Sequence, residues 1–196
     1  QEIDVVRIDE LKKLYGLGES FVVGIVGRIE EVKGQYLVLE ALAKLKDLDI
    51  KVLIVGHTMD EAYLESLKQK VKDLGIEEKV VFTGFTREVN AHMQLFDVNI
   101  LATPKETFGL VVIEAMMNKV CMIATNKAGP LEIIDDGENG LLFDRSSEDL
   151  ATKIALLYGD RDLKERLALA GYKKAKEKFH SDTQLEKLLK VLMEIK

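Results

Sequence analysis

The sequence predicts an α/β fold built on a doubly wound parallel sheet of six strands. Short runs rich in β-branched residues, several of them ending in glycine, alternate with segments of helical period, and this is the pattern of βαβ units. The six expected strands are residues 21–27, 51–56, 80–84, 98–101, 122–125 and 140–143. In such Rossmann-like sheets ligands bind outside the carboxyl ends of the strands, near the point where the strand order reverses. The strand-to-helix loops are therefore the first place to look for a site.

Helices are expected between these strands and after the last of them. In the first one Leu37, Ala41 and Leu45 fall on one helical face. Further helical periods cover residues 61–74, 87–95, 109–118 and 150–195. The last of these segments carries apolar stripes through residues 185–195, and we expect its helices to cap the domain at its C-terminal end.

Composition fits one soluble domain that spans residues 1–196. The chain is 47% hydrophobic and 32% charged, with no repeat, low-complexity tract or linker. The chain has a formal net charge of −6 and a pI near 5.3. This argues against nucleic acid or an anionic membrane as a partner attracted by the net charge of the protein, because phosphate backbones select strongly basic surfaces. Any phosphate site must therefore be local.

The cysteine and histidine content favours a reducing compartment and no metal. Cys121 is the only cysteine, so no internal disulfide can form. The three histidines, His57, His92 and His180, lie far apart in the sequence, and we expect no metal site. No apolar run approaches the roughly 18 to 20 residues that span a bilayer, and residues 1–20 do not resemble a signal peptide. A cytoplasmic protein is expected.

The loop after the first strand, GRIEEVKG at residues 27–34, carries two cations. It lacks the G-x-G-x-x-G of a dinucleotide fold, which argues against a dehydrogenase. At the carboxyl end of a strand Arg28 and Lys33 could neutralise a diphosphate. The alternative is that both are solvated loop charges balanced by Glu30 and Glu31.

The segment KETFGLVVIEAMMN, residues 105–118, contains a carboxylate within an apolar helix. The helix should begin near Gly109 and aim free backbone N–H groups at an anion above the sheet. We expect Glu114 to be buried, so it needs hydrogen-bond donors from the protein or from a ligand such as a ribose diol. Glu106, eight positions earlier, can flank the same pocket; alternatively it is an exposed acid beside Lys105.

Taken in order, these segments resemble the C-terminal, donor-binding domain of retaining nucleotide-sugar glycosyltransferases of the GT-B fold, the large group 1 family. The resemblance covers GRIEEVKG, KVLIVG, KVVFTGF, ETFGLVVIEAMM and AGPLEIIDDGENGLLF, which is nearly the whole chain. Its most specific element is the E-x7-E motif formed by Glu106 and Glu114, with FGL between them.

The resemblance implies a nucleotide-diphosphate sugar as donor, no metal and no other cofactor. It implies that Arg28 and Lys33 bind the diphosphate. It places Glu106 in the catalytic position, against hydroxyls of the transferred sugar, and Glu114 on the ribose. By the same resemblance, further contacts to the donor come from the backbone amides of Phe108, Gly109, Leu110 and Val111, and Thr86 lines the base pocket.

Some positions depart from the family pattern. The stretch ATPKE before the first glutamate is compressed relative to P-S-x-x-E, and Thr107 replaces a frequent glycine. Lys119 occupies a position where glycine is typical, which puts the turn after the helix in question. Glu132 falls on a glutamate common in the family, but we assign it no catalytic role.

The resemblance also implies a partner. Such enzymes have an N-terminal domain that binds the acceptor and closes over the donor, and no segment here corresponds to it. We therefore expect half of a hexosyltransferase, inactive by itself, with any membrane contact made through the other domain or subunit. Two other readings stay open at this point: a non-catalytic interaction module on the same fold, and half of a nucleotide-sugar epimerase or phosphorylase. The epimerase would need a histidine in the cleft, for which His57 is the candidate.

Overall fold

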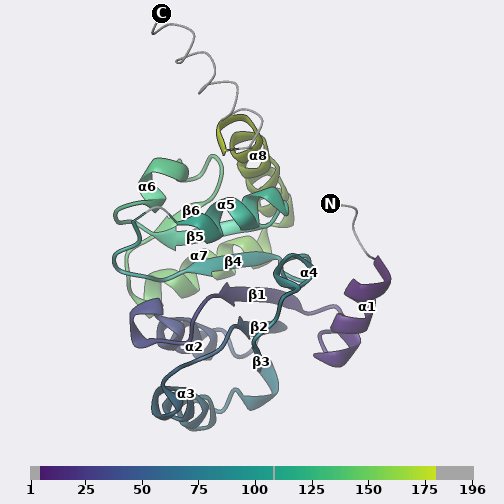
Figure 1. Ribbon diagram of the computed structural model, residues 1–196, viewed down its shortest axis with the longest axis vertical. Helices are drawn as coiled ribbons and strands as arrows, with labels where there is room; N and C mark the ends of the chain where they lie inside the picture. Colours follow the sequence, from purple (N-terminus) through teal and green to yellow (C-terminus); the bar gives the residue numbers. More distant parts are fainter. Residues whose placement is uncertain (1–4, 108, 180–196) are drawn as a thin grey trace, which may run out of the picture.

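A computed structural model describes residues 5–107 and 109–179. Its centre is a six-stranded sheet in which every strand pairing is parallel, with the order β3-β2-β1-β4-β5-β6 (Figure 1). The strands are β1 Phe21–Val26, β2 Ile50–Val55, β3 Val80–Gly84, β4 Val98–Leu101, β5 Cys121–Thr125 and β6 Leu141–Phe143. The predicted Rossmann-like sheet is confirmed, and each strand lies within one residue of its expected bounds at either end.

Helices cover both faces of the sheet. They are α1 Val5–Leu14, α2 Gln35–Lys44, α3 Glu61–Asp73, α4 Val89–Met93, α5 Leu110–Met117, α6 Pro130–Ile133, α7 Ser147–Gly159 and α8 Arg161–Phe179, with 3-10 turns at Glu31–Lys33 and Glu77–Lys79. The sequence did not predict α1, because Leu11 is its one buried side chain and so no apolar stripe forms. The stripes expected at 185–195 lie outside the described residues.

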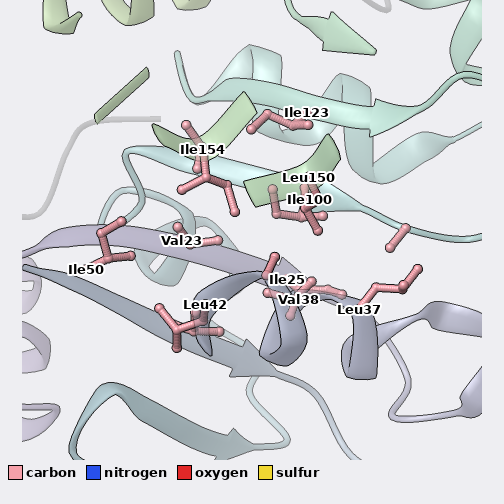
Figure 2. Close-up of a cluster of buried hydrophobic side chains, with 14 of the residues drawn as sticks. Val23, Ile25, Leu37, Val38, Leu42, Ile50, Ile100, Ile123, Leu150 and Ile154 are labelled. Atoms are coloured by element: carbon pink, nitrogen blue, oxygen red, sulfur yellow. The ribbon is translucent and has the colours of Figure 1, made fainter. Parts of the chain in front are cut away.

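One side of the sheet packs against α2, α3 and α7. Alternate residues of β1, Phe21, Val23 and Ile25, point to this side and are almost completely buried. Leu150 and Ile154 of α7 belong to the same cluster of buried side chains, which Figure 2 shows. The opposite face is buried as well, and this is why the strands are apolar in succession instead of alternating with polar residues.

Helix α8 contributes to both faces. Leu167 and Ala168 belong to the core that contains α2 and α7. Ala175, further along the same helix, belongs to the other core, in which Val112 and Met116 of α5 lie. The helix therefore joins the two apolar layers at the β5–β6 end of the sheet (Figure 1).

The turn after α5 keeps a left-handed backbone although it carries a lysine. Lys119 has φ 58°, in the region that favours glycine. Its ammonium lies 5.2 Å from the centroid of the Tyr172 ring in α8. The substitution noted in the sequence thus leaves the turn intact, and the contact with Tyr172 offsets part of the backbone strain.

The amino edge of the sheet is tied together by Asp97, just before β4. Its carboxylate accepts a 2.8 Å hydrogen bond from the backbone N–H of Val22 and pairs with Lys164 at 2.6 Å and Arg161 at 3.2 Å. The side chains of Lys164 and Asp97 are both more than four-fifths buried. Asp97 therefore connects β1, β4 and α8 at the end of the sheet opposite the loops considered next.

We predict that Asp97→Asn lowers the free energy of unfolding by about 2 kcal/mol, because two cations lose a charged partner in a poorly hydrated place. Urea denaturation measures this. The control is Glu65→Gln, which removes an exposed ion pair with Lys68 and should leave the free energy of unfolding nearly unchanged. Equal effects of the two substitutions would contradict the role given to Asp97.

Candidate functional site

A cavity of about 400 Å³ opens where the strand order reverses, between the carboxyl ends of β1 and β4 and the start of α5. Its walls include apolar residues from the two strands, Ile25, Val26, Ile100 and Leu101. Seven of the predicted site residues also line it: Arg28, Lys33, Glu106, Gly109, Leu110, Val111 and Glu114. Segments far apart in the chain thus meet in one place.

The loop after β1 is held by hydrogen bonds to its neighbours. The backbone N–H of Ile29 donates to the carbonyl oxygen of His57 at 2.8 Å, and the hydroxyl of Thr58 donates to the carbonyl oxygen of Ile29 at 2.9 Å. Gln35 Nε2 donates to the carbonyl oxygen of Arg28 at 2.8 Å. The backbone at Arg28 is therefore fixed, while its guanidinium is 63% exposed and pairs with Glu30 at 2.9 Å.

Gly34 allows this loop to approach the end of β4. Its φ of 74° lies in the left-handed region, and a Cβ there would come within 2.8 Å of both the carbonyl oxygen and the Cβ of Ala102. A side chain would therefore push the two segments apart. Their contact brings Lys33 from one loop next to Glu106 from the other.

Lys33 and Glu106 form an ion pair at 3.4 Å, with both side chains about three-quarters buried. Glu106 is thus not a free surface acid beside Lys105. The alternative prediction was that both cations are solvated loop charges balanced by nearby glutamates. It fits Arg28, which pairs with Glu30, but it does not fit Lys33, which pairs with Glu106. Each cation already has a carboxylate partner, so a bound anion would have to replace it.

The start of α5 faces the cavity with backbone donors. Gly109 precedes the helix with φ 78°, and no side chain caps this end. The first N–H groups of a helix have no acceptor within the helix, and here Leu110 and Val111 carry two of them at the cavity wall. These groups and the helix dipole favour a negative charge near Lys33.

The expectation that Glu114 is buried is wrong. It is exposed, and Leu110 on the same helix is 65% exposed, while Val112, Ala115 and Met116 are buried. The helix packs only one side against the sheet and α8, and Leu110 and Val111 in its first turn line the cavity. Among the described residues the Glu114 carboxylate has no hydrogen-bond or ion-pair partner, and it lines the cavity with its side chain available.

One of the expected contacts, Thr86, does not line this cavity, and another, Phe108, cannot be placed in it. Thr86 follows β3 outside the cavity wall, and its hydroxyl accepts a 2.9 Å hydrogen bond from the backbone N–H of Glu88. Phe108 lies outside the described residues. His57, the candidate for epimerase chemistry, does not line the cavity; its ring packs edge-on against Phe85 at 5.5 Å.

Cys121 offers no nucleophile. It lies in β5 within the core, and burial raises the pKa of its thiol to about 12.

The described residues contain no group of three His, Cys, Asp or Glu side chains that could hold a metal ion. No helix in residues 5–107 or 109–179 has the length and apolarity needed to cross a bilayer.

Gly129 supports the loop of Glu106, and the sequence did not reveal this. Its N–H donates to the carbonyl oxygen of Glu106 at 2.9 Å, and a Cβ at Gly129 would come within 2.7 Å of the carbonyl oxygens of Glu106 and Thr107. The segment AGPLE drew attention for Glu132, which is exposed and does not line the cavity. A close backbone contact leaves no signal in a single sequence beyond the glycine itself.

Fold and site together define a Rossmann-like domain with a cavity at the switch point that is lined by two cations and the N-terminus of a helix. The chain matches the family described as "Glycosyl transferases group 1" over residues 7–174, and it belongs to that family. It is 32% identical over 176 residues to N-acetyl-alpha-D-glucosaminyl L-malate synthase of Bacillus anthracis, covering 88% of this chain and 45% of that protein. It is 33% identical to a GDP-mannose-dependent mannosyltransferase of Mycobacterium tuberculosis, covering 91% of this chain and 49% of that protein.

Solved structures show the same architecture. Anabaena HepE in complex with UDP superposes with a TM-score of 0.91 at 27% identity, covering 97% of this chain and 53% of HepE. The C-terminal domain of a group 1 glycosyl transferase, LpcC of Francisella tularensis, matches with a TM-score of 0.77 at 33% identity, covering 82% of this chain and 87% of that domain. The chain spans about half the length of the curated relatives it matches.

We predict that Gly129→Ala lowers the free energy of unfolding by about 2 kcal/mol, because the new methyl group overlaps two backbone oxygens that cannot move without displacing Glu106. Thermal unfolding measures the loss. In the variant, hydrogen exchange should quicken at the backbone N–H of residue 129, which donates to the carbonyl oxygen of Glu106 in the wild type.

Gly159→Ala is the matched control. A Cβ at Gly159, the last residue of α7, would meet no atom within 4 Å, so stability should change little. If Gly129→Ala is as well tolerated as Gly159→Ala, the loop of Glu106 does not depend on this contact.

Proposed function

We propose that this chain is the donor-binding part of a retaining, nucleotide-sugar-dependent hexosyltransferase. The observation that carries the proposal is the convergence of Lys33, Glu106, Glu114 and the start of α5 on one cavity at the switch point. Family membership supports it, and so do the similar HepE structures in complex with UDP and with UDP-glucose. The sugar would move from the nucleotide diphosphate to an acceptor hydroxyl.

The proposed role of the cavity is to hold the donor and stabilise the leaving diphosphate. Arg28, Lys33 and the backbone N–H groups of α5 would surround the two phosphates, where negative charge grows as the glycosidic bond breaks. Fixed donors of this kind supply charge stabilisation from the protein itself, without a metal ion. Glu106 would accept hydrogen bonds from hydroxyls of the sugar, and Glu114 from the ribose diol.

Donor binding would require an exchange of ion-pair partners. Lys33 now pairs with Glu106 and Arg28 with Glu30. A diphosphate that replaces both carboxylates leaves Glu106 without its cation, and the sugar hydroxyls then become the natural donors to that carboxylate. In this way phosphate binding and sugar recognition would be linked through a single side chain.

A second domain or subunit would bind the acceptor and close over the donor. The coverage of about half of each curated relative supports this. Transfer needs both reactants held together and water excluded, so we expect this chain alone to bind the donor weakly and to transfer little sugar. Any membrane contact of this cytoplasmic enzyme would pass through the other domain.

Calorimetry with UDP, GDP and ADP sugars tests the proposal directly. We expect measurable binding to at least one of them, and the absence of binding to all three by a folded sample would refute the assignment. Adding the acceptor-binding domain and assaying sugar transfer then separates an enzyme from a non-catalytic module, which would bind the donor and stay inactive.

We predict that Lys33→Ala weakens binding of the nucleoside diphosphate at least about tenfold, because one charge-assisted hydrogen bond to phosphate is lost. The effect should shrink as ionic strength rises. Lys68→Ala on α3, which removes an exposed lysine paired with Glu65, is the control and should leave the Kd unchanged. Equal Kd values for the two variants would argue against a phosphate contact at Lys33.

We predict opposite effects of Glu106→Gln on two ligands. The nucleoside diphosphate should bind about threefold more tightly, because Lys33 is released and a repelling carboxylate is gone. The nucleotide sugar should bind about tenfold more weakly, because an ionised acceptor for its hydroxyls is lost. Titration of both ligands measures this, with Glu132→Gln as the control outside the cavity; changes of the same sign would contradict the exchange of partners.

A further inference from the structure

A buried hydroxyl at the cavity has no hydrogen-bond partner. Among the described residues, four buried side-chain atoms are unpaired: Gln35 Oε1, Tyr63 OH, Asn99 Oδ1 and Thr103 Oγ1. Of these four residues only Thr103 lines the candidate site. It is the second residue after β4, following Ala102, and stands three positions before Glu106.

The backbone of Thr103 is firmly placed. Its carbonyl oxygen accepts a 2.9 Å hydrogen bond from the hydroxyl of Thr125, at the end of β5. The carbonyl oxygen of the preceding residue, Ala102, accepts a 3.0 Å hydrogen bond from Arg145 Nε. Thr103 is 3% exposed, so its side chain is enclosed as well. The unpaired hydroxyl therefore does not arise from a loosely held loop.

An enclosed hydroxyl without a partner lowers stability, because it has left water and gained no hydrogen bond. Valine has nearly the same shape and would avoid this loss. In helices threonine often bonds to a carbonyl one turn earlier, but Thr103 lies outside any helix. A partner that enters the cavity would satisfy the hydroxyl.

We propose that Thr103 Oγ1 hydrogen-bonds a hydroxyl of the transferred sugar and so contributes to recognition of the sugar. This rests on the proposed function. The exposed fractions of the side chains indicate which part of the donor lies next to Thr103. Arg28 is 63% exposed and Lys33 27%, whereas Thr103 is almost fully enclosed. A diphosphate loses less hydration beside these cations than beside Thr103, while a neutral sugar can enter the more enclosed end.

Access to Oγ1 requires a side chain of the cavity wall to move, because the atom is closed to solvent here. The pair of Lys33 and Glu106 is the part of the wall that the diphosphate would separate.

Thr103→Val and Thr103→Ser test the proposal in the full chain. Isothermal titration measures the Kd of a nucleotide sugar and of the matching nucleoside diphosphate for each protein. Thr103→Val should weaken the nucleotide sugar about fivefold, the loss of one neutral hydrogen bond, and leave the nucleoside diphosphate unchanged. Thr103→Ser keeps the hydroxyl and should retain most of the wild-type affinity for the sugar donor.

Thermal unfolding provides a second measurement. Thr103→Val should raise the Tm, because it removes an unpaired buried polar group. If the hydroxyl of Thr103 served only stability, the same substitution would lower the Tm. Equal weakening of both ligands, or of neither, overturns the sugar contact while the donor site stands. If the wild-type chain binds no nucleotide or nucleotide sugar, the proposed function fails, and this assignment fails with it.

Discussion

The approach of the loop after β1 to the end of β4 is the contact on which the candidate site depends. Two neighbouring strands lead to helices on opposite sides of the sheet, and this leaves a crevice at their carboxyl ends. Gly34 allows the two segments to touch at Ala102. Without that contact a lysine and a glutamate 73 positions apart in the chain would not form a pair.

The cations of the site act only locally, within an acidic protein. A net charge of −6 does not attract anions over a distance. The cavity instead combines two cations with the backbone N–H groups of α5, and both cations are balanced by carboxylates. This arrangement keeps Lys33 neutralised although its side chain is about three-quarters buried. In the proposed function, phosphate would displace Glu106 from Lys33 and make this carboxylate available to other groups. Affinity for phosphate and selectivity for what is attached to it would then depend on the same pair.

The fold could be predicted from the sequence because strands buried on both faces are apolar throughout, and Phe21–Val26 and Ile50–Val55 show this directly. The cavity was predictable for a related reason, since parallel strands fix where their loops meet. The burial of Glu114 was mispredicted, because apolar neighbours on α5 face the cavity as well as the core. Gly129 and Thr103 escaped notice, since close contacts and unpaired atoms exist only in three dimensions.

Helix α8, which reaches both apolar layers, links the two halves of the sheet through one late segment of the chain. During synthesis the layer that contains α2 and α7 lacks Leu167 and Ala168, and the other layer lacks Ala175, until these residues of α8 have left the ribosome, so β1 to β6 remain without part of their cover. The domain should therefore reach its native state in a single late step instead of strand by strand, and exposed sheet surface during that interval is what a chaperone would encounter.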